Sequence, residues 1–344
     1  MPYIHSTYFT IASILSFETD VTELKACIQK SPIDWEDVVR VASSHLIIPV
    51  IYIRLKSKGL LDSIPEDLVL YLEEINRLNL ERNLQILEEV TTLSALLKAH
   101  NIDHVFLKGA AMLASGLYES ISERMIGDID ILIAQHQIDQ AFHLLNTAGY
   151  TKHYDFDYEV KHHRHYPRQA SEHKLAAVEL HTNVLKYNHH HLLDINDMLQ
   201  TKEEINQINV PNNYFLNLHN ILAWQINDDG YYYNHLSLKN SYDSLVLKLF
   251  NNKTLIESLA KTPVCAHYLA LNKVLFPEYQ LPPLKQHLER KQNDYRYAIN
   301  HRNYLKTTYR LKRYYINIKD RVITFATNKS YRSHIFKNKL FKKK

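Results

Sequence analysis

Cysteine and glycine are both scarce in this chain of 344 residues, with two and six copies respectively. The cysteines, Cys27 and Cys265, lie far apart in the sequence, which indicates neither a disulfide framework nor a zinc site built from cysteine pairs. The composition, 45% hydrophobic and 23% charged, excludes collagen-like, coiled-coil and wholly disordered chains. A chain of this length can bury a sizeable core, and its length indicates about two domains.

Long hydrophobic runs are also missing. No apolar run approaches the roughly 18 residues of a membrane-spanning helix. The first residues lack the basic segment and the small-residue cleavage site of a signal peptide. The sequence therefore predicts a cytoplasmic protein.

Negative charge is nearly absent from one part of the chain. Residues 290–344 hold 17 Lys and Arg against two acids, so this basic tail has a net charge of +15 within a total of +4. One alternative is that the tail attracts a polyanion or an anionic membrane surface, which would place the protein peripherally at the inner membrane face. The other is a solvated helical face whose cations pair with the acidic body and extend over their own apolar neighbours. The final Lys342–Lys344 is predicted to be disordered in both cases.

Apolar periodicity predicts helices at both ends of the body. Residues 1–100 have apolar positions three and four apart, and one helix is expected to start after Ser63, at Pro65–Asp67, and to run to about His100. Residues 188–289 are predicted to be a second helical region, with a boundary at Pro282–Pro283 before the basic helical tail of residues 290–344.

The pattern changes to strand and helix alternation in residues 101–187, which predicts a compact α/β core. The expected elements are strands at 104–107, 128–133 and 176–181, a tight turn at 108–109 followed by a helix, a helix at 138–148 ended by Gly149, and an extended piece from Tyr150. The predicted fold class is therefore α+β, with a small mixed β-sheet flanked by N-terminal and C-terminal helical regions.

Three carboxylates mark the predicted strands. Side chains alternate along a strand, so Asp128 and Asp130 share one face while Ile129 lies on the other. Two acids so close together, beside apolar neighbours, repel each other unless a cation lies between them, and Mg²⁺ suits such hard oxygen ligands. Glu179, between Val178 and Leu180, is the best candidate for a third carboxylate. The alternative is that these acids are solvent-facing side chains on an edge strand.

Cationic and glycine residues near the acids indicate a phosphate site. Gly109 at a strand-to-helix turn would let backbone N–H groups approach a phosphate, and Lys108 would add a full charge. Arg124 could bind phosphate or pair with an aspartate of the site. The alternatives are a surface cation at Lys108 and a purely structural ion pair at Arg124.

Histidines are numerous, at 21 copies, but no H-E-x-x-H or C-x-x-C spacing indicates zinc. His181 follows Glu179 by two residues and is expected to share its face, where it would either join the site or support the sheet through a hydrogen bond.

This ordered set of motifs resembles the nucleotidyltransferase-like proteins of the polymerase-beta superfamily, in particular a bacterial group called uncharacterised nucleotidyltransferases. The similarity covers about residues 35 to 250. Its motifs are L-K-G at 107–109, Arg124, D-I-D-I-L-I at 128–133, G-Y at 149–150 and V-E-L-H at 178–181. It extends to the helical run before Ile102, to His162–His165 and, more weakly, to Leu238–Lys239 and Asp243.

The resemblance implies a magnesium-dependent enzyme, with Mn²⁺ as an alternative metal. Such an enzyme transfers a nucleoside monophosphate from a nucleoside triphosphate to an acceptor and releases pyrophosphate. Asp128 and Asp130 would hold the metal ions, Glu179 would help to activate the acceptor or act as a third ligand, and His165 would line the same cleft. The chain departs from the superfamily in two places, since the usual turn is glycine-serine and the third acid is more often aspartate.

A second hypothesis is a catalytically degenerate scaffold or adaptor, in surface polysaccharide biosynthesis or in a toxin-antitoxin or defence pair. Atomic positions separate the two hypotheses. An enzyme requires the carboxylates of Asp128, Asp130 and Glu179 to converge, with Lys108 near the same cleft, whereas carboxylates on separate faces favour the scaffold. Neither the nucleotide base nor the acceptor can be read from the sequence.

Overall fold

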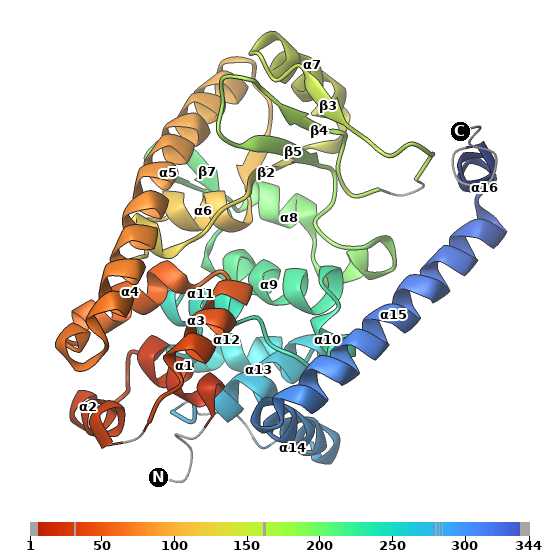
Figure 1. The fold of residues 1–344 in the computed structure, drawn as a ribbon. Helices are drawn as coiled ribbons and strands as arrows, with labels where there is room; N and C mark the ends of the chain where they lie inside the picture. Colours follow the sequence, from red (N-terminus) through yellow and green to blue (C-terminus); the bar gives the residue numbers. More distant parts are fainter. Residues whose placement is uncertain are drawn as a thin grey trace.

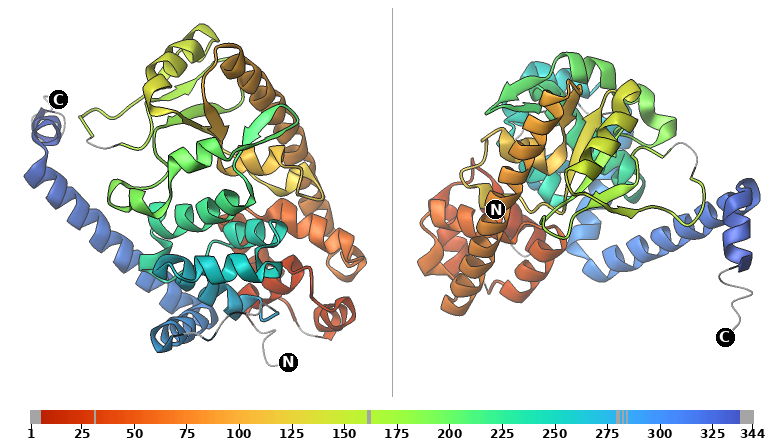
Figure 2. Two further views of the ribbon diagram at one scale, coloured as in Figure 1. Left: turned by 180° about the vertical axis from the view of Figure 1, so that it is seen from behind. Right: turned by 90° about the horizontal axis from the view of Figure 1, so that it is seen from above.

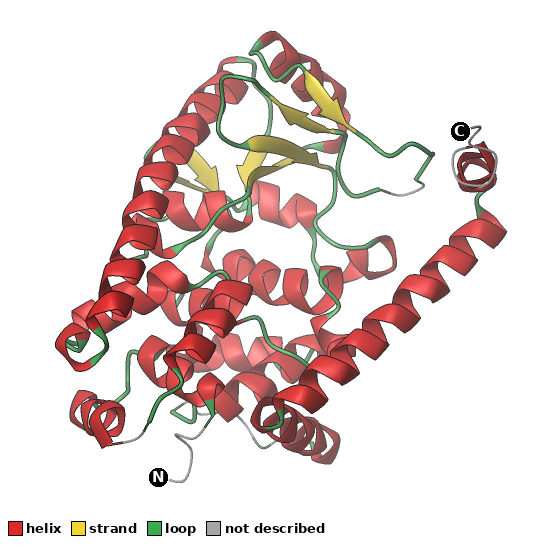
Figure 3. Cartoon of the chain, in the orientation of Figure 1, coloured by secondary structure: helices red, strands yellow, loops and turns green. Residues whose placement is uncertain are grey.

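The computed structural model describes residues 6–30, 32–160, 163–278, 281, 283 and 285–337 (Figure 1). The predicted boundary residue Pro282, His162 of the histidine-rich segment and the predicted disordered Lys342–Lys344 lie outside the described residues. The fold is α+β, as predicted. Strands gather in one part of the molecule and helices form the rest (Figure 3).

A mixed five-stranded sheet with the order β1-β2-β5-β4-β3 forms the core. Only β2 and β5 pair in parallel, and the other neighbours are antiparallel. Two further strands, β6 and β7, form a separate hairpin. The strands are β1 (His104–Phe106), β2 (Asp128–Ile133), β3 (Lys152–Tyr154), β4 (Arg168–Ala170), β5 (Ala177–His181), β6 (Glu203–Ile205) and β7 (Ile208–Val210).

Strand β2 has a hydrogen-bonded neighbour on each side, β1 and β5. Its last residues, Ile131–Ile133, are fully buried, because a strand covered on both faces needs apolar side chains on both. The prediction of a buried strand at 128–133 is thus confirmed, and the alternative of an edge strand is excluded. The predicted strands at 104–107 and 176–181 are also confirmed, each one residue shorter than expected.

The N-terminal region is helical, as predicted. Its longest helix, α5, begins after Pro65, carries Glu66 and Asp67 at the positive end of its dipole, and runs along the sheet domain for 34 residues (Figure 1). The helices before the sheet are α1 (Thr7–Leu15), α2 (Val21–Lys30), α3 (Trp35–Ser44), α4 (Ile48–Ser57) and α5 (Glu66–Ala99).

Two helices belong to the core itself. Helix α6 (Lys108–Ala114) follows β1 directly and packs against β2. Helix α7 (Ile138–Thr147) ends before Gly149, whose φ of 95° is a conformation that other residues rarely adopt. Both elements agree with the predicted turn-helix and the predicted helix at 138–148.

The C-terminal helical region packs below the sheet in Figure 1. Helix α9 contacts both α6 and α11, so it joins this region to the core. A π-helical segment, Ala223–Asn227, continues α9. The helices are α8 (Ile195–Gln200), α9 (Asn213–Leu222), α10 (Gly230–Tyr233), α11 (Leu238–Val246), α12 (Lys253–Leu259), α13 (Pro263–Leu275) and α14 (Gln286–Asn300).

The basic tail forms two more helices, α15 (Arg302–Thr327) and α16 (Lys329–Ile335). Helix α15 has no buried residue and projects away from the body in every view (Figures 1 and 2). Its far end returns to the core, where Asn328 Nδ2 donates to the carbonyl of Glu159 at 2.7 Å. Among the described residues, a single ion pair, Arg302 with Asp37, joins the tail to the body, so the tail's cations are not neutralised by the acidic body. None of the described helices combines the length and the apolar character needed to cross a membrane.

Candidate active site

The parallel pairing of β2 with β5 brings the predicted acids together. Asp130 lies opposite Glu179 in the register, and both side chains occupy the face that also carries His181. His181 Nε2 lies 2.8 Å from Asp130 Oδ1 and 3.7 Å from Glu179 Oε2. One ligand atom from each of these three residues lies within 4.8 Å of the other two. The prediction that His181 shares the face of Glu179 is confirmed.

Lys108 provides the cation next to these acids. Its Nζ lies 2.5 Å from Asp130 Oδ1, and the backbone N–H of Leu107 donates to the Asp130 carbonyl at 2.9 Å. Lys108 has a φ of 48°, a left-handed conformation that costs a non-glycine residue about 1–2 kcal/mol. Such strain persists where surrounding contacts enforce it and is concentrated at functional sites.

Asp130 is held in its charged form. Burial alone would raise its pKa, but the Lys108 ammonium and the hydrogen bond from His181 hold it well below its usual range. Burial likewise opposes ionisation of Glu179, yet the hydrogen bond from His181 keeps the Glu179 pKa below its usual value. In turn, hydrogen bonds to Asp130 and Glu179 outweigh burial and raise the pKa of His181.

Asp128 is half-buried at the start of β2 and stands slightly apart. It is not one of the three converging residues, and it lines the neighbouring cleft instead. Burial raises its pKa, and the negative charges of Asp130 and Glu179 raise it further. The three carboxylates therefore repel one another, and a bound cation would reduce this repulsion.

The donor set fits a hard divalent cation. Asp130 and Glu179 offer carboxylate oxygens, the ligands that such cations prefer, and Asp128 lies within electrostatic range of both. Asp130 Oδ1 accepts hydrogen bonds from Lys108 and His181, so a cation would either replace Lys108 at this oxygen or bind the other oxygen of the carboxylate. His181 donates its Nε2 proton to Asp130 Oδ1, so it orients this carboxylate instead of offering that nitrogen to the cation.

A cleft of about 210 Å³ opens between the core and the C-terminal helices. Its walls carry four cationic side chains, from Lys108, Arg124, Arg164 and Lys239. Lys239 is crowded by positive charge, since Arg124 and burial lower its pKa to about 8. Three acids also line this cleft, Asp128, Asp228 and Asp243. Asp243 pairs with Arg124 and Asp130 pairs with Lys108, which leaves Arg164 and Lys239 without an ion pair among the described residues and able to contact a phosphate.

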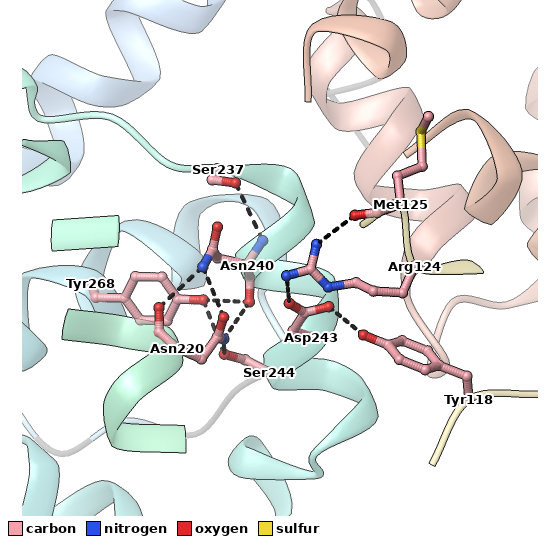
Figure 4. Close-up of polar contacts among 9 residues, drawn as sticks. All are labelled: Tyr118, Arg124, Met125, Asn220, Ser237, Asn240, Asp243, Ser244 and Tyr268. Carbon is pink, nitrogen blue, oxygen red and sulfur yellow. Dashed lines mark hydrogen bonds and ion pairs between the residues drawn. The ribbon is translucent and has the colours of Figure 1, made fainter. Parts of the chain in front are cut away.

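Arg124 makes a different ion pair from the one expected. It pairs with Asp243 of α11, with 3.2 Å between Nη2 and Oδ2, and not with an acid of the D-x-D motif. Figure 4 shows Arg124 reaching across from the core toward Asp243, which also accepts a 2.6 Å hydrogen bond from Tyr118. The pair is buried, and it therefore connects the core to the C-terminal helices.

Helix α11 is itself anchored by a polar network around this pair. The side-chain amide of Asn220 in α9 donates to the backbone carbonyl of Asn240 in α11, and the side-chain amide of Asn240 donates to Asn220 Oδ1. Tyr268 of α13 donates to the same carbonyl of Asn240 at 2.8 Å (Figure 4). The loop that carries Arg124 is fixed from the other side, because the side-chain amides of Asn79 and Asn83 in α5 donate to its backbone carbonyls.

The chain matches a family model over residues 31–251, well over half of its length. It belongs to the uncharacterised nucleotidyltransferase family. A search of curated proteins finds no match to this chain. The matched residues include every acid and cation of the site described above, and the predicted resemblance is confirmed.

Several cleft residues of this nucleotidyltransferase-family chain escaped prediction. Lys239 and Asp243 were visible only as the weakest part of the resemblance, and Arg164 only as a member of a histidine-rich segment. His219 and Asp228 carry no motif, because they reach the cleft through the packing of α9 and the π-helical segment. Burial and the nearby Lys108 charge lower the pKa of His219 to about 3, so it lines the cleft as a neutral side chain.

His165 approaches the carboxylates as the resemblance implied. It forms an isolated bridge with His181, and its Nε2 lies 3.8 Å from Glu179 Oε2. Burial lowers its pKa, which leaves it neutral near pH 7.

Gly109 is required by packing. A Cβ at this position would lie 2.7 Å from Cγ1 of the buried Ile126, closer than side chains can approach. We expect Gly109→Ala to lower the free energy of unfolding by about 1–3 kcal/mol, because the core must shift to accept it. Gly127→Ala is the matched control, since its Cβ would meet no atom within 4 Å. Urea unfolding of both variants tests this, and equal stability would contradict it.

Proposed function

We propose that this protein is a magnesium-dependent nucleotidyltransferase that moves a nucleoside monophosphate from a nucleoside triphosphate to an acceptor hydroxyl. The observation that carries the proposal is the convergence of Asp130, Glu179 and His181 beside Lys108, at a cleft with four cationic side chains. Membership of a nucleotidyltransferase family supports the same reaction class. Mn²⁺ is the alternative metal.

Asp128 and Asp130 would hold the metal, with Glu179 as a third ligand or as the base. When bound, a divalent cation neutralises phosphate charge and polarises the attacking oxygen. His181 fixes the orientation of Asp130 through its 2.8 Å hydrogen bond, and Lys108 pairs with the same carboxylate.

The reaction exchanges one phosphorus–oxygen bond for another. The acceptor oxygen forms a bond to the α-phosphorus, and the bond from that phosphorus to the bridging oxygen breaks, so pyrophosphate leaves. The hydroxyl proton passes to Glu179, which is ionised because the pKa of its carboxyl lies below its usual value. Arg164 and Lys239 line the cleft where they can neutralise the departing pyrophosphate.

Labelled triphosphates test the direction of transfer. The protein is incubated with Mg²⁺, a cell extract that supplies acceptors, and a triphosphate labelled at either the α- or the γ-phosphate. We expect the α-label in a new product and the γ-label in pyrophosphate. A γ-label in the product would instead indicate a kinase, and label in neither product would contradict the proposal.

A scaffold without catalytic activity is the second candidate. One observation favours it: Asp128 lies outside the group of converging ligand atoms from Asp130, Glu179 and His181. In addition, Asp130 already has hydrogen bonds from Lys108 and His181. The labelling experiment separates the two candidates, because a scaffold transfers neither label.

A further inference from the structure

A second, larger cavity lies beside the cleft and has no role in the reaction described so far. It has a volume of about 620 Å³ and is formed by α1, α3, α15 and the chain around α10 and α11. Five cationic side chains line it, and none of its lining residues is acidic. The cationic residues are Lys239, Arg302, Lys306, Arg310 and Arg313.

Four of these cations come from one face of α15. Residues 302, 306, 310 and 313 follow the three- and four-residue spacing that places side chains on the same side of a helix. Arg302 is neutralised by Asp37. By contrast, Lys306, Arg310 and Arg313 are exposed and make no ion pair with any other residue that the structure describes. This face of α15 therefore presents three uncompensated charges to the cavity.

The opposite wall carries two stacked histidines. The rings of His45 and His235 are stacked with 5.7 Å between their centroids, and the ring of Tyr8 lies roughly perpendicular to both. Burial lowers the pKa of His235 to about 4, so it is neutral near pH 7. His235 is 8% exposed, so the two rings form an uncharged, largely buried wall opposite the cations of α15.

The cavity adjoins the candidate active site. Lys239 lines both the cavity and the cleft that holds Lys108 and Asp128. Two adjacent residues also lie one on each side: Ala223 lines the cleft and Trp224 lines the cavity. The cavity and the cleft are thus neighbours that share the side chain of Lys239 as part of their walls.

We propose that this cavity binds a phosphate group of the acceptor, which holds the acceptor while its hydroxyl enters the cleft. The role of the bound molecule as acceptor rests on the proposed function. The phosphate site itself is inferred from the residues of the cavity alone. Three uncompensated cations on one helix face bind a phosphate more strongly than a neutral or cationic group. The acceptor class is therefore a phosphate ester, either soluble or part of a lipid headgroup.

Trp224 reports on this site directly. The chain has two tryptophans, so Trp35→Phe leaves Trp224 as the sole one, at the cavity wall. Its fluorescence is titrated with glycerol phosphate in one arm and with vesicles containing phosphatidic acid in the other, with neutral vesicles as the blank. We expect a saturable change in at least one arm, and the arm that responds identifies the source of the phosphate.

The deciding variant reverses two cations of the cavity. Lys306→Glu with Arg310→Glu, in the Trp35→Phe background, changes only exposed side chains. We expect it to raise the dissociation constant about tenfold or more, because two attractive charges at the phosphate become repulsive. Lys319→Glu with Arg321→Glu is the matched control, because it makes the same charge change farther along α15, outside the cavity. This control should bind as tightly as the parent.

Three outcomes would overturn the proposal. The first is no fluorescence change with either glycerol phosphate or phosphatidic acid vesicles. The second is an equal weakening of binding by the two charge-reversal pairs. The third is loss of the fluorescence change in Asp128→Asn with Asp130→Asn, which would place the ligand in the cleft. None of these readouts depends on transfer activity. Failure of the labelling experiment with intact phosphate binding would therefore remove the acceptor role and leave the phosphate site.

Discussion

Asp130→Asn is expected to reduce nucleotidyl transfer by at least about 10²–10³-fold. The substitution keeps the shape of the side chain but removes the charge at the point where Lys108 and His181 converge. Metal ions contribute several kcal/mol of transition-state stabilisation, and each 1.36 kcal/mol corresponds to a tenfold change in rate. Transfer of α-label to the product, measured at saturating triphosphate, gives the ratio.

The control for this variant is Asp155→Asn. Asp155 lies on an exposed loop, so the same chemical change there should leave the rate unaltered. Circular dichroism and thermal unfolding of Asp130→Asn must show a folded protein, because Asp130 is buried between two partners. A folded Asp130→Asn protein with the activity of the parent would contradict a metal-binding role for this residue.

Arg124→Met is expected to lower the free energy of unfolding by about 3–5 kcal/mol. The side chains of Arg124 and Asp243 are only 8% and 2% exposed. Removing the arginine takes away the ion pair of the buried Asp243 carboxylate, which keeps one hydrogen bond, from Tyr118, and the more distant charge of Lys239. Removing one partner of a buried ion pair is strongly destabilising. Urea unfolding of the parent and the variant measures the difference.

The double variant Arg124→Met with Asp243→Leu separates charge from packing. An apolar pair of similar volume can replace a buried ion pair at little cost, so we expect the double variant to recover most of the lost stability. If Arg124 acts mainly as a phosphate ligand, Arg124→Met will instead lose less than about 1 kcal/mol of stability, in the range of exposed ion pairs. That result would contradict the structural assignment of Arg124.

The sequence predicted the strands and acids of the α/β core more fully than the helices that complete the cleft. Period-two alternation at Asp128–Ile133 identified the strand, the face of the acids and the burial of the isoleucines. The motif around Glu179 identified the neighbouring strand. Both signals are local, since the alternation of side chains on a strand depends only on adjacent residues.

The partners of the site could not be predicted, because they come from distant helices. Asp243 reaches Arg124, and Lys239 reaches the cleft, only through the packing of α11 against the core. No periodicity encodes the distance between residues more than a hundred positions apart. For the same reason the sequence left two roles open for Arg124, and Asp243, already part of the resemblance, could be recognised as its partner only from the fold.

The basic tail illustrates the same limit. Composition revealed a charge of +15 in residues 290–344, which were predicted to form a basic helical tail, and Arg302–Thr327 form helix α15. The position of its proximal face over His45 and His235 follows from the packing of α14 on α13 and of α15 on α14, together with the ion pair of Arg302 with Asp37. From its charge, one alternative was a tail that attracts a polyanion anywhere along its length. The structure places four of its cations in one cavity.

Binding of nucleoside triphosphates tests the central claim most directly. Isothermal titration of the parent protein with ATP, GTP, CTP and UTP, each with and without Mg²⁺, measures whether the cleft takes the substrate. We predict saturable binding of at least one triphosphate that requires Mg²⁺ and weakens at least about tenfold in Asp128→Asn with Asp130→Asn. Absence of binding by every triphosphate, or binding that neither EDTA nor this double variant alters, would contradict the assignment of these carboxylates to a nucleotidyltransferase site.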